Sequence, residues 1–128
     1  FGFDDAVYAM IRVLELIAKG FNLDDELDSL PKLYSSDEIK IDTTEEMKFK
    51  IIDELKKELH NTKNGLPKIV DVIDIDGVRI KFENGWGLVR ASNTTPVLVA
   101  RFEAGSLETK ELLEQKVLSL VQKLKAKI

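Results

Sequence analysis

The sequence predicts an α+β domain in which helices cover one face of an antiparallel sheet, preceded by a helical segment. Four β-type segments follow one another between residues 69 and 104, and the first two turns between them contain Asp-Gly and Asn-Gly. A helix with one apolar side precedes these segments and a second follows them. Strands joined by such short turns pair antiparallel, and a helix with one apolar stripe packs on a sheet through that stripe.

Composition limits the possible functions. The 128 residues are 44% hydrophobic and 33% charged, which suits one folded domain rather than a disordered chain. The net charge of −4 argues against nucleic acid or an anionic membrane as partner. With no cysteine and a single histidine, disulfides, thiolate-bound metals and multi-histidine centres are excluded. We find no stretch of membrane-spanning length and no signal peptide, and we therefore expect a cytoplasmic protein.

The first predicted helix is apolar on two sides. Asp4 and Asp5 can cap its start, and Gly20 is placed to end it. A helix of this kind is normally buried between layers, so we expect it to belong to something larger, and the start at Phe1 suggests that the chain begins upstream. The two apolar stripes are Val7, Met10, Leu14 and Ile17, and Ala6, Ala9, Val13 and Leu16.

A short acidic helix is predicted over residues 23–30, where Pro31 stops it. Its acidic run, residues 24–28, lacks the glycine and terminal glutamate of a calcium loop, so we interpret it as acidic residues at a helix N-terminus. Residues 32–42 are expected to be a connector followed by a strand, with Ile39 and Ile41 on one face.

The next helix is predicted from Thr43, which with Glu46 forms a capping-box signature, to near Asn61. His60 falls at its C-terminus, where a positive charge is favourable, and this interpretation is preferred to a catalytic role. The apolar side consists of Met47, Ile51, Ile52, Leu55 and Leu59.

Strands are predicted over residues 69–75, 78–83, 86–91 and 97–104. Asp76-Gly77 and Asn84-Gly85 predict two-residue hairpins with positive φ at both central positions. The last helix is expected to begin near Ser106, with glutamates early and lysines late. Its buried stripe is predicted to be Leu113, Val117, Leu120, Leu124 and Ile128.

The stretch between the third and fourth of these strands is unusual for a hairpin. Four small polar residues, Ser92–Thr95, stand between Arg90-Ala91 and Pro96. Hydroxyls, a carboxamide and successive backbone N–H groups can surround an oxyanion, and arginine can bind phosphate through two parallel hydrogen bonds. An ordinary polar turn with an incidental arginine fits the composition equally well.

Residues 76–80, 85–96 and 101–104 closely resemble the C-terminal domain of the α-D-phosphohexomutases, the phosphomannomutase/phosphoglucomutase enzymes. The order of strands and helices is also similar to that family's last domain, which has a TATA-box-binding-protein-like fold. The opening Gly2–Ala9 resembles the end of the third domain. The resemblance thus implies that residues 1–34 are the end of that domain with a connector, hinged near 30–36, and that residues 35–128 are the C-terminal phosphate-binding domain.

In that family the loop binds the phosphate of the sugar substrate, a role that the resemblance implies for Arg90, Ser92, Asn93 and Thr94. Thr95 and Pro96 are expected to shape the loop. Arg101 is left out of the site because it lies about four strand residues, roughly 13 Å, from the loop. The loop resembles the mannose/glucose branch, since phosphoglucosamine mutases have Ser-Gly-Thr-Glu-Pro here.

The resemblance implies a parent enzyme that interconverts hexose 1-phosphate and hexose 6-phosphate through a phosphoserine and a bisphosphate intermediate. The family's phosphoserine, Mg²⁺-binding loop and sugar-selecting loop would lie upstream of Phe1. We therefore expect no catalytic residue, metal or cofactor in this chain, and as partners the phosphosugar and the upstream domains. Two alternatives remain open: an autonomous phospho-ligand binding module, and a non-catalytic interaction domain with the first helix as an interface.

Overall fold

The computed structural model describes residues 4–61 and 65–128 of the chain. These divide into two compact units, Phe1–Lys32 and Leu33–Ile128. The assignment of residues 1–34 to the end of a preceding domain, and of residues 35–128 to a C-terminal domain, remains a prediction.

The first unit contains two helices, α1 (Ala6–Ala18) and α2 (Leu23–Asp28). Asp5 caps α1 by accepting a hydrogen bond from the backbone N–H of Tyr8 at 2.8 Å, and Gly20 ends it with φ of +89°. The second helix stops at Asp28, two residues earlier than expected. No residue of α1 is buried, including those of its two apolar stripes.

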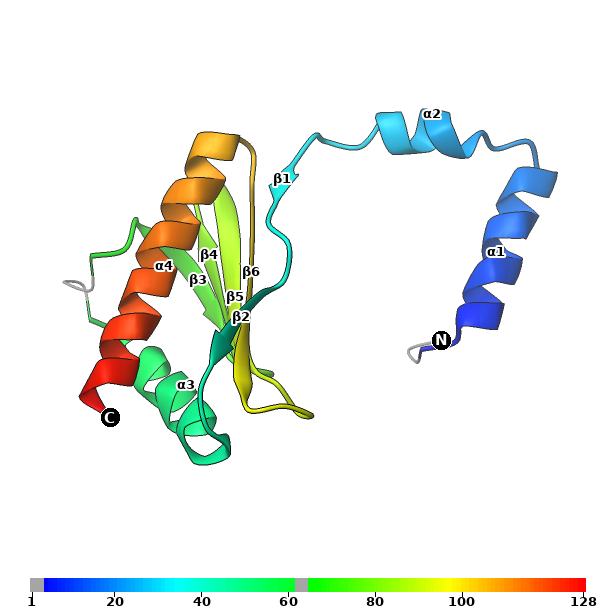
Figure 1. The fold of residues 1–128 in the computed structure, drawn as a ribbon. Coiled ribbons are helices and arrows are strands. Elements are labelled where there is room, and N and C mark those ends of the chain that lie inside the picture. Colours follow the sequence, from blue (N-terminus) through cyan, green and yellow to red (C-terminus); the bar gives the residue numbers. More distant parts are fainter. Residues whose placement is uncertain (1–3, 62–64) are drawn as a thin grey trace. The chain divides into compact units, whose positions relative to one another are not determined.

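The second unit is an antiparallel sheet with two helices, which confirms the predicted α+β class. The sheet order is β1-β6-β5-β4-β3, and β2 also pairs with β6. Strands β1 and β2 pair with opposite ends of β6. Helices α3 and α4 lie against each other on the same side of the sheet (Figure 1). The elements are β1 (Tyr34–Ser35), β2 (Ile39–Asp42), α3 (Glu45–Leu59), β3 (Ile69–Ile73), β4 (Val78–Phe82), β5 (Gly85–Ala91), β6 (Val97–Ala104) and α4 (Leu107–Lys127).

The core lies between the sheet and the two helices. Alternate strand residues point toward the helices, as the period of two in a strand requires; those buried in β4 and β6 are Val78, Ile80, Phe82, Leu98, Ala100, Phe102 and Ala104. The helices contribute Ile51, Ile52, Leu55, Leu59, Leu113, Val117, Leu120, Val121 and Leu124. Ile128, predicted to belong to this stripe, is instead 47% exposed because it follows the last helical residue as the C-cap.

The start of α3 was predicted one residue too early. Thr44, not Thr43, is the N-cap, and its side chain accepts a hydrogen bond from the N–H of Met47 at 3.2 Å. The Thr43–Glu46 capping box is therefore wrong. The physical reason is a tertiary contact: the N–H of Thr43 donates to the carbonyl oxygen of Pro96 at 3.0 Å, which ties this segment to the β5–β6 loop.

The two predicted hairpins differ from the expected turn type. No described residue other than glycine has a positive φ, and within the two predicted turns only Gly77 does, at +81°. In the second turn Gly85 already pairs with Phe82 as the first residue of β5, so Glu83 and Asn84 form the turn. A Cβ at Gly85 would lie 2.5 Å from the carbonyl oxygen of Glu103, which explains glycine there without a positive φ.

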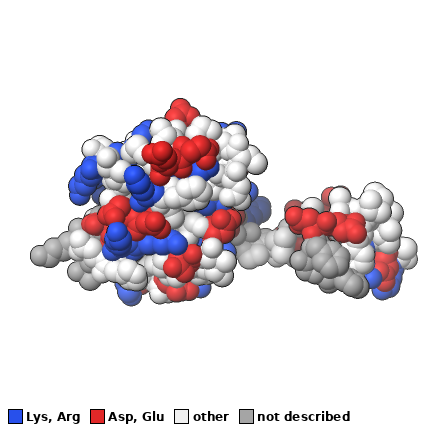
Figure 2. Space-filling model, turned by 90° about the horizontal axis from the view of Figure 1, so that it is seen from below, with Lys and Arg blue, Asp and Glu red and all other residues white. Residues whose placement is uncertain are grey.

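The surface charge is mixed rather than of one sign. Figure 2 shows lysine and arginine side chains interspersed with aspartate and glutamate on the face in view. Among the described residues, no helix combines the length and the apolar character needed to cross a membrane.

Candidate functional site

The predicted phosphate loop connects β5 to β6. The last strand pair before it joins Ala91 to Leu98, and the N–H of Ser92 donates to the carbonyl oxygen of Val97 at 3.0 Å. The N–H of Val97 donates to the carbonyl oxygen of Thr95 at 2.8 Å, a three-residue turn centred on Pro96, whose fixed φ suits it. Residues 93–96 between these closures are exposed.

Ser92 organises the interior of the loop. Its side chain is 9% exposed, and its Oγ lies 2.9 Å from Oγ1 of Thr95. The same Oγ accepts from the N–H of Thr95 at 3.2 Å and, more weakly, from that of Thr94 at 3.4 Å. Within the loop, therefore, Ser92 and Thr95 bind each other, whereas Asn93 and Thr94 present their side chains to solvent.

Arg90 stands at the end of β5, on the sheet face opposite the helices. Its neighbours Val89 and Ala91 are buried on the helix side, and its own side chain is 34% exposed. One guanidinium nitrogen lies 3.8 Å from Oδ2 of Asp76, whose side chain is 70% exposed. So long an ion pair to a solvated partner contributes little, and the guanidinium can exchange it for an anionic ligand.

Lys48 lies beneath the loop, and sequence reasoning missed it. Its side chain is only 2% exposed. The ammonium Nζ donates to the carbonyl oxygens of Ser92 at 2.7 Å and Thr95 at 3.3 Å, and pairs with a carboxylate oxygen of Glu45 at 2.7 Å. The signal was present in the sequence: Lys48 precedes Ile52 by four residues, so a charged residue occupies a position of the apolar stripe.

Arg101 lies closer to the site than its separation along the strand suggested. It pairs with Leu88, and Arg90 pairs with Val99, so the two arginines are diagonal neighbours on the same sheet face. Diagonal neighbours lie roughly 7–8 Å apart. The separation of about four strand residues applies to the loop, whereas Arg90 lies on the adjacent strand, nearer to Arg101.

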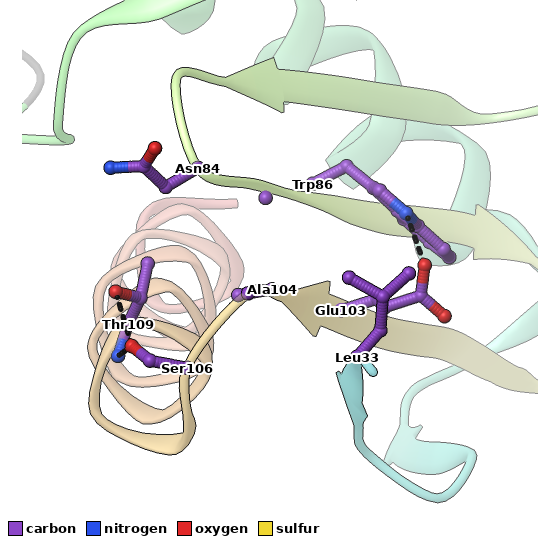
Figure 3. Close-up of a pocket in the computed structure, with 9 residues that line it drawn as sticks. Leu33, Asn84, Trp86, Glu103, Ala104, Ser106 and Thr109 are labelled. Atoms are coloured by element: carbon purple, nitrogen blue, oxygen red, sulfur yellow. Dashed lines mark hydrogen bonds between the residues drawn. The ribbon is translucent and has the colours of Figure 1, made fainter. Parts of the chain in front are cut away.

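A pocket of about 520 Å³ lies at the other end of these strands (Figure 3). Trp86 at the start of β5 donates from its indole Nε1 to Oε1 of Glu103 at 3.1 Å, and Ser106 caps α4 beside it. The other carboxylate oxygen of Glu103 accepts from the hydroxyl of Ser35 at 3.0 Å. This pocket contains none of the predicted site residues and is separated from the loop by the length of β5.

The clear pKa shifts lie away from the loop, and the described residues form no cluster of metal-ligating side chains. Among the described residues, no three His, Cys, Asp or Glu side chains gather as a metal site, so these residues do not fit Mg²⁺. The pKa shifts that are clear belong to exposed ion pairs elsewhere: the hydrogen bond that Lys68 donates lowers the pKa of Glu83 and raises the pKa of Lys68.

Comparisons with known proteins agree with this architecture. Residues 38–120 match the family model of the phosphoglucomutase/phosphomannomutase C-terminal domain. A phosphomannomutase/phosphoglucomutase of Pseudomonas putida is 48% identical over 107 residues, which cover 83% of this chain and 22% of that protein. A phosphoglucomutase of Neisseria meningitidis serogroup B is 38% identical over 123 residues, 95% of this chain and 26% of that protein.

The fold has a close counterpart among solved structures. A phosphoglucomutase/phosphomannomutase family protein from Burkholderia thailandensis superposes with a TM-score of 0.75 at 33% identity, covering 98% of this chain and 25% of that one. The chain thus spans about a quarter of the length of these relatives. The family match, the sequence identities and the shared fold together show that this chain belongs to the phosphoglucomutase/phosphomannomutase family, through the C-terminal domain of its members.

Proposed function

We propose that this chain is the substrate-phosphate-binding part of a phosphomannomutase/phosphoglucomutase, and that Arg90, Ser92, Asn93 and Thr94 bind the phosphate that is not being transferred. The observation that carries the proposal is the β5–β6 loop, in which exposed Asn93 and Thr94 stand beside a half-buried arginine with only a loose ion pair. The guanidinium offers two parallel N–H groups to one phosphate, and the loop adds a hydroxyl, a carboxamide and backbone N–H groups.

Ser92 and Thr94 differ in what they contribute. The hydroxyl of Ser92 already binds Thr95 within the loop, so in addition to binding the phosphate it holds the loop in shape. Thr94 and Asn93 are exposed and contact the phosphate directly with their side chains.

The parent reaction explains why a fixed phosphate site is needed. A phosphoserine upstream passes its phosphoryl group to the free hydroxyl of the hexose phosphate, and after the bisphosphate has turned around, the serine takes back the other phosphoryl group. One site must therefore hold the non-reacting phosphate in both orientations. Binding energy at this remote phosphate orients the reacting end and helps to exclude water.

We also propose that this domain moves as a lid. Its hinge is shorter than the segment near residues 30–36 that the sequence indicated. The predicted hinge extended to Ser36, but Tyr34 and Ser35 pair with β6, and the N–H of Ser36 donates to the carbonyl oxygen of Phe102 at 2.8 Å. These bonds attach the end of the connector to the sheet. The hinge is therefore expected before Tyr34.

The test is a titration of the 128-residue chain with glucose 6-phosphate, followed by the backbone amide signals. We expect Ser92, Asn93 and Thr94 to shift first, with a dissociation constant on the order of millimolar, about 4 kcal/mol. Arg90→Ala is expected to remove most of the shift of these amide signals. Arg90→Lys is expected to give a shift between those of the wild type and Arg90→Ala, because lysine keeps the charge without the planar fork. Lys81→Ala is the matched control, since it removes a positive charge from the same sheet face opposite Trp86, four strand residues away from Arg90.

Equal binding by the wild type and Arg90→Ala, or shifts clustered elsewhere, overturns the proposal and leaves residues 90–96 as a polar turn. An autonomous phospho-ligand binding module would give the same titration result as a mutase domain. The reading frame upstream of Phe1 distinguishes these two possibilities, because a serine-bearing domain and an aspartate-rich metal loop encoded there support the mutase. The proposal includes a cytoplasmic location and the upstream domains as partners, and it gives nucleic acid and membranes no role.

A further inference from the structure

The buried ammonium of Lys48 has no role in the phosphate contacts described above, yet it touches the loop that makes them. We propose that Lys48 is a positioning residue: it sets the peptide orientation of the β5–β6 loop so that the backbone N–H of Asn93 faces the bound phosphate. This inference rests on the proposed function, because it concerns the same site.

All hydrogen-bonding capacity of Lys48 is used in this arrangement. An ammonium has three N–H donors, and the three partners are the carbonyl oxygen of Ser92 at 2.7 Å, that of Thr95 at 3.3 Å and the carboxylate of Glu45 at 2.7 Å. Two of the three are backbone groups of the loop, at its first and fourth residues. Lys48 therefore joins α3 to both sides of the loop tip.

The consequence for the loop follows from peptide geometry. In a trans peptide the C=O and the next N–H point in opposite directions. The carbonyl of Ser92 points down to Nζ of Lys48, so the N–H of Asn93 points away from α3. Its side chain is exposed, and its N–H makes no hydrogen bond to the residues that the structure describes. A free, outward N–H three residues after Arg90 is the donor that an oxyanion needs.

Lys48 does not act mainly through its charge. Glu45, four-fifths of one helical turn away, neutralises the ammonium at 2.7 Å, so the pair adds little net potential at the loop. Nor is this ion pair a strong reason for stability, because the Glu45 side chain is 65% exposed and ion pairs with a solvated partner contribute little. What an apolar side chain cannot supply is the pair of donors to the loop carbonyls.

The experiment compares Lys48→Met with Lys50→Met in the 128-residue chain. Lys50 is exposed on the same helix, so its replacement removes the same charge without touching the loop. Each variant is titrated with glucose 6-phosphate below its melting transition, and the amide signal of Asn93 is followed. Lys48→Met is expected to weaken binding by about tenfold or more, the value of one hydrogen bond to a charged group, and to shift the Asn93 amide before ligand is added. Lys50→Met is expected to resemble the wild type.

A third variant, Lys48→Gln, separates carbonyl anchoring from charge. Its amide N–H₂ can still donate to a loop carbonyl although it is uncharged, so we expect affinity between those of the wild type and Lys48→Met. Equal affinities of Lys48→Gln and Lys48→Met, wild-type affinity in Lys48→Met, or loss of the melting transition in both Lys48 variants overturns the proposal. Failure of the wild type itself to bind overturns the proposed function instead.

Discussion

Replacing Gly77 by alanine tests the contact between the β3–β4 turn and the strand that carries Arg90. Gly77 has φ of +81°, and a Cβ there would lie 2.5 Å from the carbonyl oxygen of Val89, 2.5 Å from Cβ of Arg90 and 2.6 Å from its Cα. The obstacle is thus mainly the backbone of β5, which cannot rotate out of the way as the end of a long side chain could.

Two destabilising effects and one stabilising effect determine how far Gly77→Ala changes the free energy of unfolding. A left-handed conformation costs an L-residue about 1–2 kcal/mol, and forcing an extra methyl group into a packed site costs about 1–3 kcal/mol. The lower entropy of the unfolded chain returns about 0.4–1 kcal/mol. We therefore expect Gly77→Ala to lower the free energy of unfolding by roughly 1–5 kcal/mol, where each kcal/mol corresponds to about 4–8 °C in the Tm of a domain of this size.

Gly65→Ala is the matched control. Gly65 has nearly the same conformation, φ of +78°, but apart from its chain neighbours no atom of the described residues lies within 4 Å of the position its Cβ would take. Alanine at this position has the same unfavourable φ but no steric clash, so we expect Gly65→Ala to lower the free energy of unfolding by about 1 kcal/mol. The assay is urea unfolding of the wild type and both variants, followed by far-ultraviolet circular dichroism.

The phosphate titration adds a functional measurement on the same variants. Because the new methyl group pushes on Arg90, Gly77→Ala should also weaken the response of the loop to glucose 6-phosphate, and Gly65→Ala should leave it unchanged. If the two variants lost equal stability, the close approach of Gly77 to β5 would be refuted, and with it this account of how Arg90 is held.

Two further predictions concern the chain as a whole. Removal of residues 1–32 should leave the unit Leu33–Ile128 with a cooperative melting transition, because the contacts of the chain divide at that boundary; loss of the transition would make α1 and α2 part of the core. The 128-residue chain alone, assayed with glucose 1-phosphate or mannose 1-phosphate, Mg²⁺ and a bisphosphate activator, should show no mutase turnover, since neither an aspartate-rich metal loop nor the family's serine motif occurs in its sequence. Measurable turnover by the pure chain would contradict this.

The sequence predicted most of the fold because local patterns and tertiary structure agree in it. The stripe of α3 from Ile51 to Leu59 is buried as expected, and β6 has the predicted bounds, Val97–Ala104. Where they disagree, a long-range contact is responsible: Thr43 has the sequence context of a helix cap, but its N–H donates a hydrogen bond to the carbonyl oxygen of Pro96. The two-residue strand β1 has too little pattern to be predicted and exists only through its pairing with β6.

The same contrast between local sequence patterns and long-range contacts applies to the candidate site. Its types of residue, an arginine followed by Ser-Asn-Thr, could be recognised in the sequence because they are adjacent in it. Their separate roles could not, since only the folded loop directs the hydroxyl of Ser92 inward to Thr95. Lys48 stands 44 residues before Ser92, and no local pattern relates the two.

By itself, then, the sequence determined the family, the α+β class and the order of the elements other than β1, and it predicted a phosphate-binding role for the β5–β6 loop, because side-chain periodicity and short motifs depend on neighbours along the chain. Only the tertiary structure decided how that loop is held: from below by Lys48 and Thr43, and at its edge by the contact of Gly77 with Arg90. These contacts join residues that are far apart in sequence, and burial of the helices against the sheet is what brings them within hydrogen-bonding distance.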